Sequence, residues 1–319
     1  MKTTIRRILV AVDLSESRDA AFDRALLLAR GWNAALFLLH TQGPRPVSRF
    51  AIAGEDLELE SNKAEQSHLR ALVRSAKDDG VEVQVISADG APAPAIAAYA
   101  QLVAADLIVV GRDFGSSRLW RSPRVAATVG RSAAVPVLIV PSRKAAPRTI
   151  PERPFKKVVV AMDFTVASAV ALRVATNVFA QGDGRATVVH ALPYASPMVF
   201  SGSEASWVID DLRSRLAQAE AHLRGAIPAG ARHRVTPRVV AGAAGQAILD
   251  VAAEVDADLV VMGVPRRNRL GELFFGSTFR RVVRRSRRPI LAIPVAGGTY
   301  RWPGEPPAHV VNEGHLRAA

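Results

Sequence analysis

The stretch Asp258–Pro294, DLVVMGVPRRNRLGELFFGSTFRRVVRRSRRPILAIP, decides how the rest of the chain is interpreted. An apolar run stands at each end, and between them lie an arginine-rich loop, the sequence Gly276-Ser277-Thr278 and the basic segment Phe279–Arg288. This order predicts a strand, a loop, a helix and a second strand. Because the first backbone N–H groups of a helix are unpaired and carry a partial positive charge, the stretch predicts an anion site around Gly276–Thr278.

The short apolar segments of this stretch also occur in the first half of the chain. Ala257–Gly263, ADLVVMG, is matched by Ala105–Gly111, ADLIVVG, about 150 residues earlier, as expected of a duplicated domain. The other matching pairs are Ile8–Ser15 with Val158–Thr165, Leu36–His40 with Thr187–His190, and Val135–Pro141 with Arg288–Pro294. Four matching pairs in the same order predict two copies of one domain.

Short apolar runs alternate with longer amphipathic segments in both halves, which predicts a doubly wound α/β fold. The runs rich in Val, Ile and Leu are continuous, as in parallel strands that are buried on both faces. We therefore predict two Rossmann-like domains, each a five-stranded parallel sheet with helices on both faces. The predicted helices are Asp19–Arg30, Leu57–Asp78, Pro94–Leu102, Ser168–Phe179, Trp207–Arg224 and Gln246–Glu254, and the third strands are Val81–Ile86 and Arg234–Val240.

Proline and glycine mark the predicted domain boundaries. Residues 1–141 form the first domain, residues 142–155 a proline-rich linker and residues 156–295 the second domain. Residues 296–319 contain glycines and prolines without periodicity, so we predict a flexible tail there. Residues 41–54, after the second strand of the first half, are predicted to form a loop.

The composition limits which cellular compartment and which partners can be expected. The chain carries a formal net charge of +13 and no cysteine, so disulfides and cysteine-ligated metal sites are excluded. The first apolar run, Ile8–Val12, is too short for a signal peptide and no run is long enough to span a membrane, so we expect a cytoplasmic protein. The excess of arginine favours polyanionic partners, or else reflects the arginine-rich surfaces typical of a high-GC genome.

Three residues of the second half are expected to meet at one edge of the sheet. Asp163 ends the first strand, Ala191 follows the second and Gly263 ends the fourth. Ligands of open parallel sheets bind beyond the carboxyl ends of the strands. A carboxylate there accepts hydrogen bonds from an adenine or a ribose, while the Gly276–Thr278 turn holds phosphates. The pattern therefore predicts a nucleotide site.

With these residues the chain resembles a universal stress protein of the tandem type, which implies an adenine nucleotide alpha hydrolase-like fold in each half. Nucleotide-binding members of that family share the motif Gly, two residues, Gly, nine residues, Gly and then Ser or Thr. Gly263 and Gly276-Ser277 have this spacing, whereas Arg266 stands at the second glycine. Its guanidinium either pairs with the phosphates or keeps them from the backbone.

The resemblance also implies a ligand and its contacts. The ligand is ATP or another adenine nucleotide, with Mg²⁺ left open. Asp163 matches the aspartate on the base and ribose side, Ala191 matches the residue that packs near the adenine, and Met262 is expected to wall the same pocket. Thr278, next to the motif serine, belongs to the predicted phosphate turn.

The first half retains less of the motif. Asp13, Thr41 and Gly111 match by position, but Ser122-Pro123-Arg124 stands where Gly-Ser is expected. Proline removes a backbone N–H donor. We therefore expect the first half to bind nucleotide poorly or not at all.

Some of these residues have a purely structural alternative. Asp13 and Asp163 could cap the helices that follow them. His40 and His190 recur at matching strand ends without acidic residues at ligand spacing, so we expect packing rather than metal binding. The arginines of Phe279–Arg288 are typical of a solvated helix face, and no DNA-binding motif accompanies them, so nucleic acid is not an expected partner.

The sequence contains no Walker motif and no nucleophile elbow, so we expect a binding protein rather than an enzyme. The resemblance implies a regulatory or stress-protective role that depends on the bound nucleotide. The alternatives are polyanion binding through the arginine-rich face and slow nucleotide hydrolysis. The final strands, Val137–Val140 and Ile290–Ile293, are expected to pair within the chain, as the resemblance implies, and further homo-oligomerisation stays open.

Overall fold

The computed structural model describes residues 5–12, 14, 20–42, 51–53, 63–112, 123–141, 155–179, 183–193, 203–265, 276–296, 300 and 302–303. Strands and helices alternate in both halves, as the sequence predicted. The first half contains β1 (Arg7–Ala11), α1 (Ala20–Trp32), β2 (Ala35–Gln42), β3 (Ala51–Ala53), α2 (Lys63–Asp78), β4 (Val83–Asp89), α3 (Pro92–Leu102), β5 (Leu107–Gly111), α4 (Pro123–Ser132) and β6 (Val137–Val140). The second contains β7 (Lys157–Met162), α5 (Val166–Val174), a π-helical turn η1 (Ala175–Phe179), β8 (Arg185–Leu192), α6 (Ser203–Ala226), a 3-10 turn η3 (Ala229–Arg234), β9 (Val235–Ala241), α7 (Ala244–Glu254), β10 (Leu259–Pro265), α8 (Gly276–Arg285) and β11 (Ile290–Val295).

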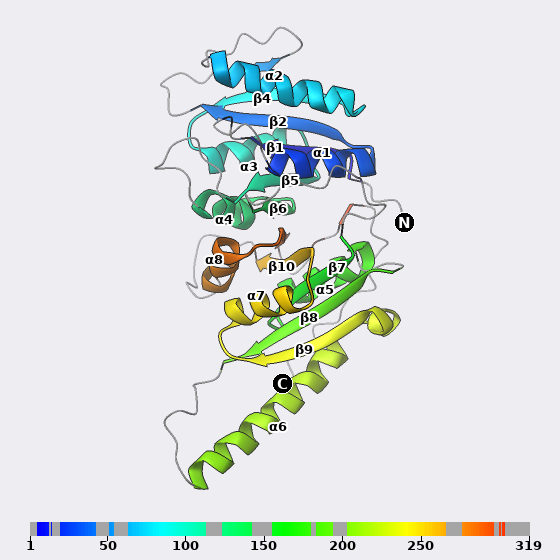
Figure 1. The fold of residues 1–319 in the computed structure, drawn as a ribbon, viewed down its shortest axis with the longest axis vertical. Coiled ribbons are helices and arrows are strands. Elements are labelled where there is room, and N and C mark those ends of the chain that lie inside the picture. The colour runs from blue at the N-terminus through cyan, green and yellow to red at the C-terminus, as the bar shows by residue number, and fades with distance from the viewer. Residues whose placement is uncertain are drawn as a thin grey trace.

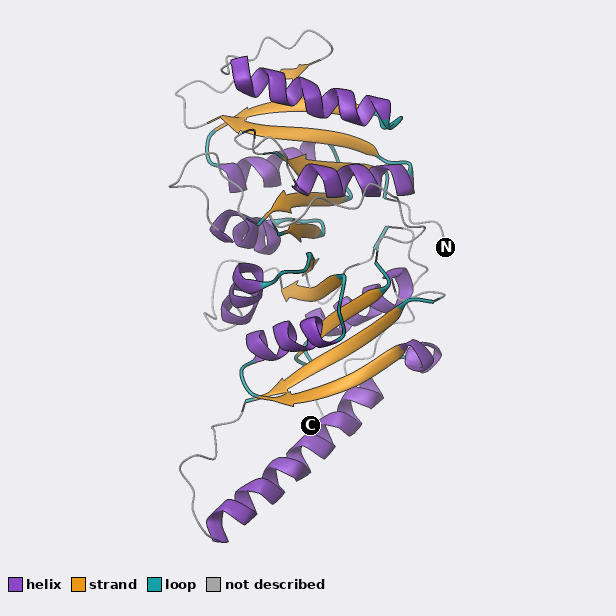
Figure 2. Ribbon diagram, viewed as in Figure 1, coloured by secondary structure: helices purple, strands orange, loops and turns teal. Residues whose placement is uncertain are grey.

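All these strands belong to one sheet that runs through the molecule (Figures 1 and 2). In the described part of the chain it has eleven strands, in the order β3-β4-β2-β1-β5-β6-β11-β10-β7-β8-β9. β6 and β11 are neighbours and pair antiparallel, with Val137–Ile139 opposite Ile290–Ala292. The predicted pairing of the two final strands is therefore confirmed, and neither strand is left as an exposed edge.

The sheet has helices on both faces, which confirms the predicted α/β class. The side chains of α1, α2, α5 and α6 join one apolar core, and those of α3, α4, α7 and α8 join the other. Each core runs through both halves, and central strand residues such as Val260 and Val261 are fully buried between them. Burial on both faces explains the continuous apolar runs. No helix in the described part of the chain is both long and apolar enough to cross a membrane.

The structure differs from the sequence predictions at three elements. Within residues 41–54, predicted as a loop, β3 pairs antiparallel with β4, so the first half has a sixth strand and is not wholly parallel. A strand of three residues is too short to show a periodic pattern. β10 does not end at Gly263 but pairs with β11 as far as Pro265. α8 begins at Gly276, where the anion site was predicted, but it ends at Arg285 rather than at Arg288.

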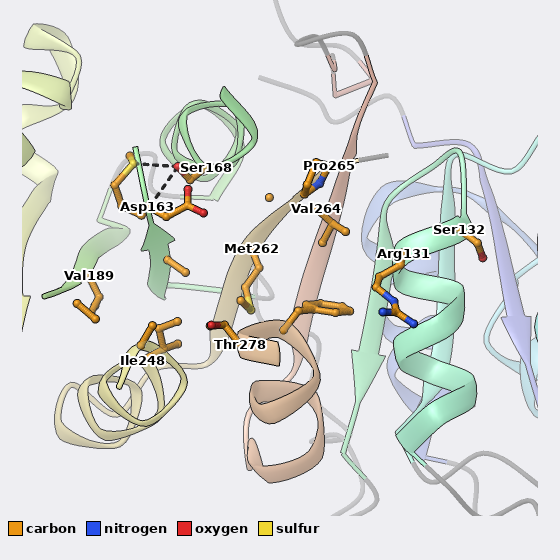
Figure 3. A pocket seen from close by; sticks show the side chains of 16 residues that line it. Arg131, Ser132, Asp163, Ser168, Val189, Ile248, Met262, Val264, Pro265 and Thr278 are labelled. Carbon is orange, nitrogen blue, oxygen red and sulfur yellow. Dashed lines mark hydrogen bonds between the residues drawn. The ribbon is translucent and has the colours of Figure 1, made fainter. Parts of the chain in front are cut away.

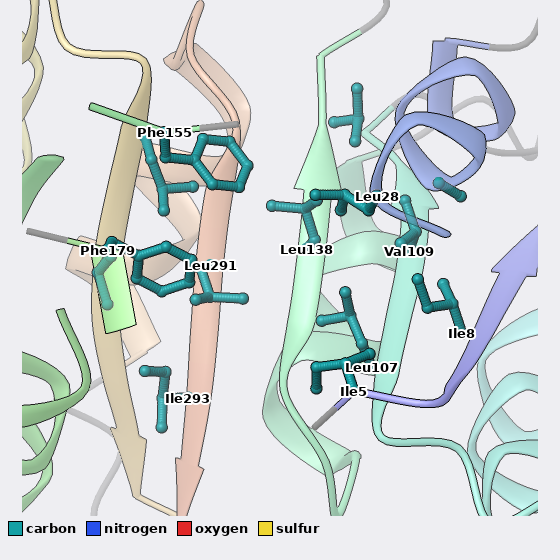
Figure 4. Packing of buried hydrophobic residues seen from close by; sticks show 14 of the residues in the cluster. Ile5, Ile8, Leu28, Leu107, Val109, Leu138, Phe155, Phe179, Leu291 and Ile293 are labelled. Atoms are coloured by element: carbon teal, nitrogen blue, oxygen red, sulfur yellow. The ribbon is translucent and has the colours of Figure 1, made fainter. Parts of the chain in front are cut away.

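The joint between the halves is closed by apolar side chains. Leu138 of β6 and Leu291 of β11 are opposite each other in the paired register (Figure 4). The Phe279 ring on α8 packs on Gly130 of α4 so closely that a Cβ atom on Gly130 would lie 2.9 Å from it. The last turn of α4 therefore lies beside the first turn of α8, and the glycine allows this close approach.

The predicted flexible tail is packed into the core at one residue. Trp302 is 2% exposed, and its ring meets that of Phe179 edge-on, with the centroids 5.5 Å apart. Phe179 packs edge-on against Phe155 at 5.6 Å, and the Arg24 guanidinium of α1 lies 5.8 Å from the centroid of Phe155. The prediction for residues 296–319 does not hold at Trp302, because one long-range aromatic contact leaves no periodic pattern in the sequence.

The repeated Ala-Asp pairs that precede β5 and β10 have the same structural role. Asp106 accepts hydrogen bonds from two backbone N–H groups at the start of β1, at 2.8 and 3.0 Å, and Asp258 accepts two at the start of β7, at 2.8 and 3.1 Å. Burial raises the pKa of Asp258. Burial also lowers the pKa of Arg24 in α1, and the electrostatic attraction of Asp258 in the second half opposes that shift.

Candidate functional site

A cavity of about 590 Å³ opens at the carboxyl edge of the second half (Figure 3). It lies within the range of about 300–1,000 Å³ that is usual for small-molecule sites. Its lining includes the predicted site residues Asp163, Ala191, Met262, Gly263 and Thr278. The other lining residues are Arg131, Ser132, Ala161, Met162, Ser168, Val189, Ala244, Ile248, Val264, Pro265 and Phe279.

Asp163 lies in the turn between β7 and α5. Its Oδ1 accepts hydrogen bonds from the Thr165 backbone N–H at 3.1 Å and from the Thr165 hydroxyl at 2.5 Å. Thr165, rather than Asp163, caps α5, because its Oγ1 accepts a hydrogen bond from the Ser168 N–H at 3.3 Å. Asp163 therefore supports the cap through one oxygen, and its exposed side chain lines the cavity (Figure 3).

Gly263 also has a structural reason to be glycine. A Cβ atom on it would lie 1.9 Å from the carbonyl oxygen of Ala167, 2.3 Å from the carbonyl carbon and 2.9 Å from the Ser168 nitrogen. The obstacle is the backbone of the first turn of α5, which cannot move aside as a flexible side chain could. The first glycine of the predicted phosphate motif is thus already required for close approach of a helix.

The start of α8 borders the cavity. Thr278 is half-buried and lines it, whereas Ser277 is exposed and is not among the described lining residues. Of the two hydroxyls predicted at this helix start, the one that lines the cavity is therefore that of Thr278. Gly276 is the first residue of the helix, as an anion site there requires. Arg266 lies outside the described residues.

The end of the cavity near Asp163 is mostly apolar. Val189 and Ile248 lie there, and Met262, which is 6% exposed, lies between this end and the side formed by α4 (Figure 3). Ala191, near the end of β8, is half-buried and adds a small side chain to the wall. An apolar wall with few polar groups is typical of a site for a flat heterocycle.

A cluster of rings beside Asp163 was not predicted from the sequence. Phe164 has a left-handed backbone, φ 59°, and its ring stacks on His222 of α6 with centroids 4.3 Å apart. His190 lies 4.6 Å from the same ring, and its Nδ1 is 2.9 Å from the Met162 carbonyl oxygen. This contact agrees with the expected packing of His190 at a strand end. No local pattern links His222 to Phe164.

The corresponding edge of the first half takes part in the joint. Thr41 and Gly111 lie near the carboxyl ends of β2 and β5, as predicted, and Asp13 lies outside the described residues. Arg112, which follows Gly111, donates a 2.6 Å hydrogen bond to the Ser286 carbonyl oxygen beyond the end of α8. α4 begins with Pro123, which has no N–H to offer an anion.

Two cavity residues come from the other half of the chain. Arg131 and Ser132 belong to the last turn of α4, which is part of the first half. Sequence reasoning missed both, because only the pairing of β6 with β11 brings this turn beside α8. The cavity is therefore shared between the halves.

The universal stress protein family matches the chain twice, over residues 4–141 and 154–294. The chain therefore belongs to this family, with two domains in tandem, and the resemblance inferred from the motif is confirmed. Each domain has the adenine nucleotide alpha hydrolase-like fold expected of it.

Three individual proteins illustrate what the chain is similar to. Universal stress protein YxiE of Bacillus subtilis (strain 168) is 29% identical over 144 residues, which are 42% of this chain and 97% of that protein. A universal stress protein from Archaeoglobus fulgidus DSM 4304 is 18% identical with a TM-score of 0.57, over 90% of this chain and 96% of its own. This likeness extends over both halves and shows the shared fold. Another universal stress protein structure, a complex with cAMP, is 29% identical over 42% of this chain and 96% of its own, with a TM-score of 0.33.

Proposed function

We propose that the second half binds an adenine nucleotide, ATP or a related one, in the cavity beside Asp163. The observation that supports this most directly is that one cavity joins the Asp163 carboxylate, an apolar wall and the start of α8. A carboxylate accepts hydrogen bonds from ribose hydroxyls or an exocyclic amine, an apolar wall suits a base, and a helix start suits phosphates. An adenine nucleotide carries all of these groups, with the ribose between the base and the phosphates.

We further propose that binding serves a regulatory or protective role in the cytoplasm rather than turnover. Asp163 is the one carboxylate among the described lining residues, and one of its oxygens already holds the Thr165 turn. A general base must reach the proton that it removes, either directly or through one water. This donor set favours holding a nucleotide over hydrolysing it.

The first test compares the two helix starts. Pro123 begins α4 and Gly276 begins α8, so Gly276→Pro gives the second half the residue found in the first. The first helical position accepts proline, so the fold should persist while one phosphate-facing N–H is lost. We expect ATP to bind about tenfold more weakly, as for the loss of one hydrogen bond to a charged group, when measured by isothermal titration calorimetry with Mg²⁺ and repeated with cAMP.

Serine at position 276 is the matched control for this test. Gly276→Ser keeps the N–H group and should retain most of the affinity. Equal ATP affinity in Gly276→Pro and the unsubstituted protein would exclude the start of α8 as the phosphate site. Absence of adenine-nucleotide binding in the unsubstituted protein would exclude the proposed function itself.

A second candidate function, polyanion binding, is favoured by one feature of the joint. Residues 123–141 contain two arginines and residues 276–296 contain six, and neither range contains Asp or Glu. Arg288 is paired with Asp256 at 2.7 Å, whereas Arg131, Arg284 and Arg285 are exposed. Helices α4 and α8 therefore present a basic surface without carboxylates of their own.

Salt dependence tests this second function. If about five arginines contact phosphates, affinity for a fluorescent single-stranded DNA should fall about a hundredfold between 50 and 200 mM salt, as measured by anisotropy. Binding of ATP in the cavity should change much less. If DNA does not bind at 50 mM salt, or if Arg284→Glu with Arg285→Glu leaves its affinity unchanged, this function is excluded.

A further inference from the structure

The cavity of the second half is completed by the first half. Arg131 and Ser132 of α4 lie on the side opposite to Asp163 and Val189 (Figure 3). Thr278 of α8 lies between these two sides. The cavity thus has a carboxylate and an apolar wall at one end, a helix start in the middle and a guanidinium at the other end.

Arg131 is held at this position by the joint. It follows Gly130, whose Cα carries no side chain and so allows the Phe279 ring of α8 to pack against α4. Phe279 is 4% exposed and lines the cavity itself. The antiparallel pairing of β6 with β11 holds α4 and α8, which adjoin these strands in the chain, beside each other. The Arg131 backbone is therefore anchored to the same helix whose first turn lines the cavity through Thr278 and Phe279.

The charge around Arg131 favours an anion. It is an exposed side chain, and neither α4 nor α8 contains an acidic residue. The Asp163 carboxylate lies at the far end of the cavity (Figure 3). Guanidinium groups bind phosphate oxygens through two parallel hydrogen bonds, which makes arginine well suited to a terminal phosphate.

The repeat supplies a natural comparison residue. Arg131 stands five residues before Pro136, and Arg284 stands five residues before Pro289 at the equivalent position of α8. Both side chains are exposed arginines in the last turns of their helices. Arg284 is not among the described residues that line the cavity. Its removal changes the net charge by the same amount without changing the site.

We propose that Arg131 binds the terminal phosphates of a nucleotide held by the second half, so that the ligand bridges the two halves. This inference rests on the proposed function, with adenine and ribose near Asp163. It assigns the substrate class: nucleoside di- and triphosphates, whose phosphates extend past Thr278, bind more tightly than monophosphates and nucleosides. It also makes the bound ligand a further contact between two domains that are already joined through β6 and β11.

Titration calorimetry of adenosine, AMP, ADP and ATP tests this assignment. Arg131→Ala should weaken ATP binding about tenfold. Its affinities for adenosine and AMP should stay within about twofold of those of the unsubstituted protein, because only the longer phosphate chain reaches α4. Arg131→Lys should recover part of the loss, since it restores the charge but not the two parallel hydrogen bonds. Arg284→Ala at the same ionic strength should bind all four ligands like the unsubstituted protein.

The outcomes separate this inference from the function on which it rests. If the unsubstituted protein binds none of the four ligands, both proposals are overturned. A second case is that the unsubstituted protein binds ATP while Arg131→Ala either binds ATP equally well or loses as much affinity for adenosine as for ATP. Either result overturns only the role of Arg131. Equal losses in Arg131→Ala and Arg284→Ala would show a general charge effect and would also overturn it. Circular dichroism and thermal midpoints of each variant establish that the fold is retained.

Discussion

Replacing Gly263 by alanine is expected to destabilise the protein by about 3 kcal/mol or more, which is the upper range for overpacking a well-packed site. The new Cβ atom would lie 1.9 Å from the Ala167 carbonyl oxygen and 2.3 Å from its carbonyl carbon. Relief requires α5 to move away from β10, and α5 packs on β7, β10 and β11. The midpoint and the slope of the urea unfolding curve give the loss of stability.

Gly111→Ala is the matched control for this substitution. Gly111 ends β5 at the equivalent position of the first half, and among the described residues nothing lies within 4 Å of a Cβ atom placed on it. Its replacement should therefore change stability by no more than about 0.5 kcal/mol. Similar stabilities for the two variants would mean that contact with Ala167 does not explain Gly263. We also expect weaker ATP binding in Gly263→Ala, because a shift of α5 moves the Thr165 turn that holds Asp163.

Patterns within short stretches predicted most of the fold. Runs such as Leu259–Met262 could be assigned to buried parallel strands because burial on both faces requires an unbroken apolar sequence. The duplication and the topology then placed Asp163, Ala191 and Gly263 at one edge, where they line the same cavity. The rule that carboxyl ends of parallel strands meet at one edge needs no knowledge of side-chain contacts.

Features that depend on contacts between distant residues could not be predicted in this way. Arg131 reaches the cavity only because β6 pairs with β11 and brings α4 beside α8. Thr165 caps α5 in place of Asp163, a choice between two adjacent polar residues that depends on local backbone geometry. Gly263 was predicted only as the first glycine of the phosphate motif, whereas its missing Cβ is already required by the Ala167 carbonyl. Sequence spacing gives the position of such a glycine, and only coordinates show what approaches it.

The two halves use equivalent positions differently. At the start of the last helix the second half has Gly276 and the first has Pro123, so only the second can donate an N–H there. At the strand end before that helix, Arg112 of the first half binds the Ser286 carbonyl oxygen of α8. The edge equivalent to the proposed nucleotide site thus contributes to the joint. This difference supports the expectation that the first half binds nucleotide poorly.

Replacing Trp302 by alanine is expected to cost about 3–5 kcal/mol of stability, the range for removing a fully buried large aromatic side chain. Trp302 is 2% exposed and packs edge-on against Phe179 at 5.5 Å. Phe179 packs on Phe155, and Phe155 lies under the Arg24 guanidinium of the first half. Because these contacts form a chain from the C-terminal segment to α1, the loss should also loosen the contact between the halves. Urea unfolding gives the loss of stability, and hydrogen exchange of α1 amides reports the loosening.

Two control variants separate burial from the simple loss of a large apolar residue. Leu102→Ala removes a side chain that is 63% exposed and should change stability by no more than about 0.5 kcal/mol. Trp302→Phe keeps a ring against Phe179 and should recover part of the loss. If Trp302→Ala unfolds at the same urea concentration as Leu102→Ala, the C-terminal segment does not stabilise the core. If stability falls but exchange in α1 is unchanged, the aromatic contacts stabilise the second half alone.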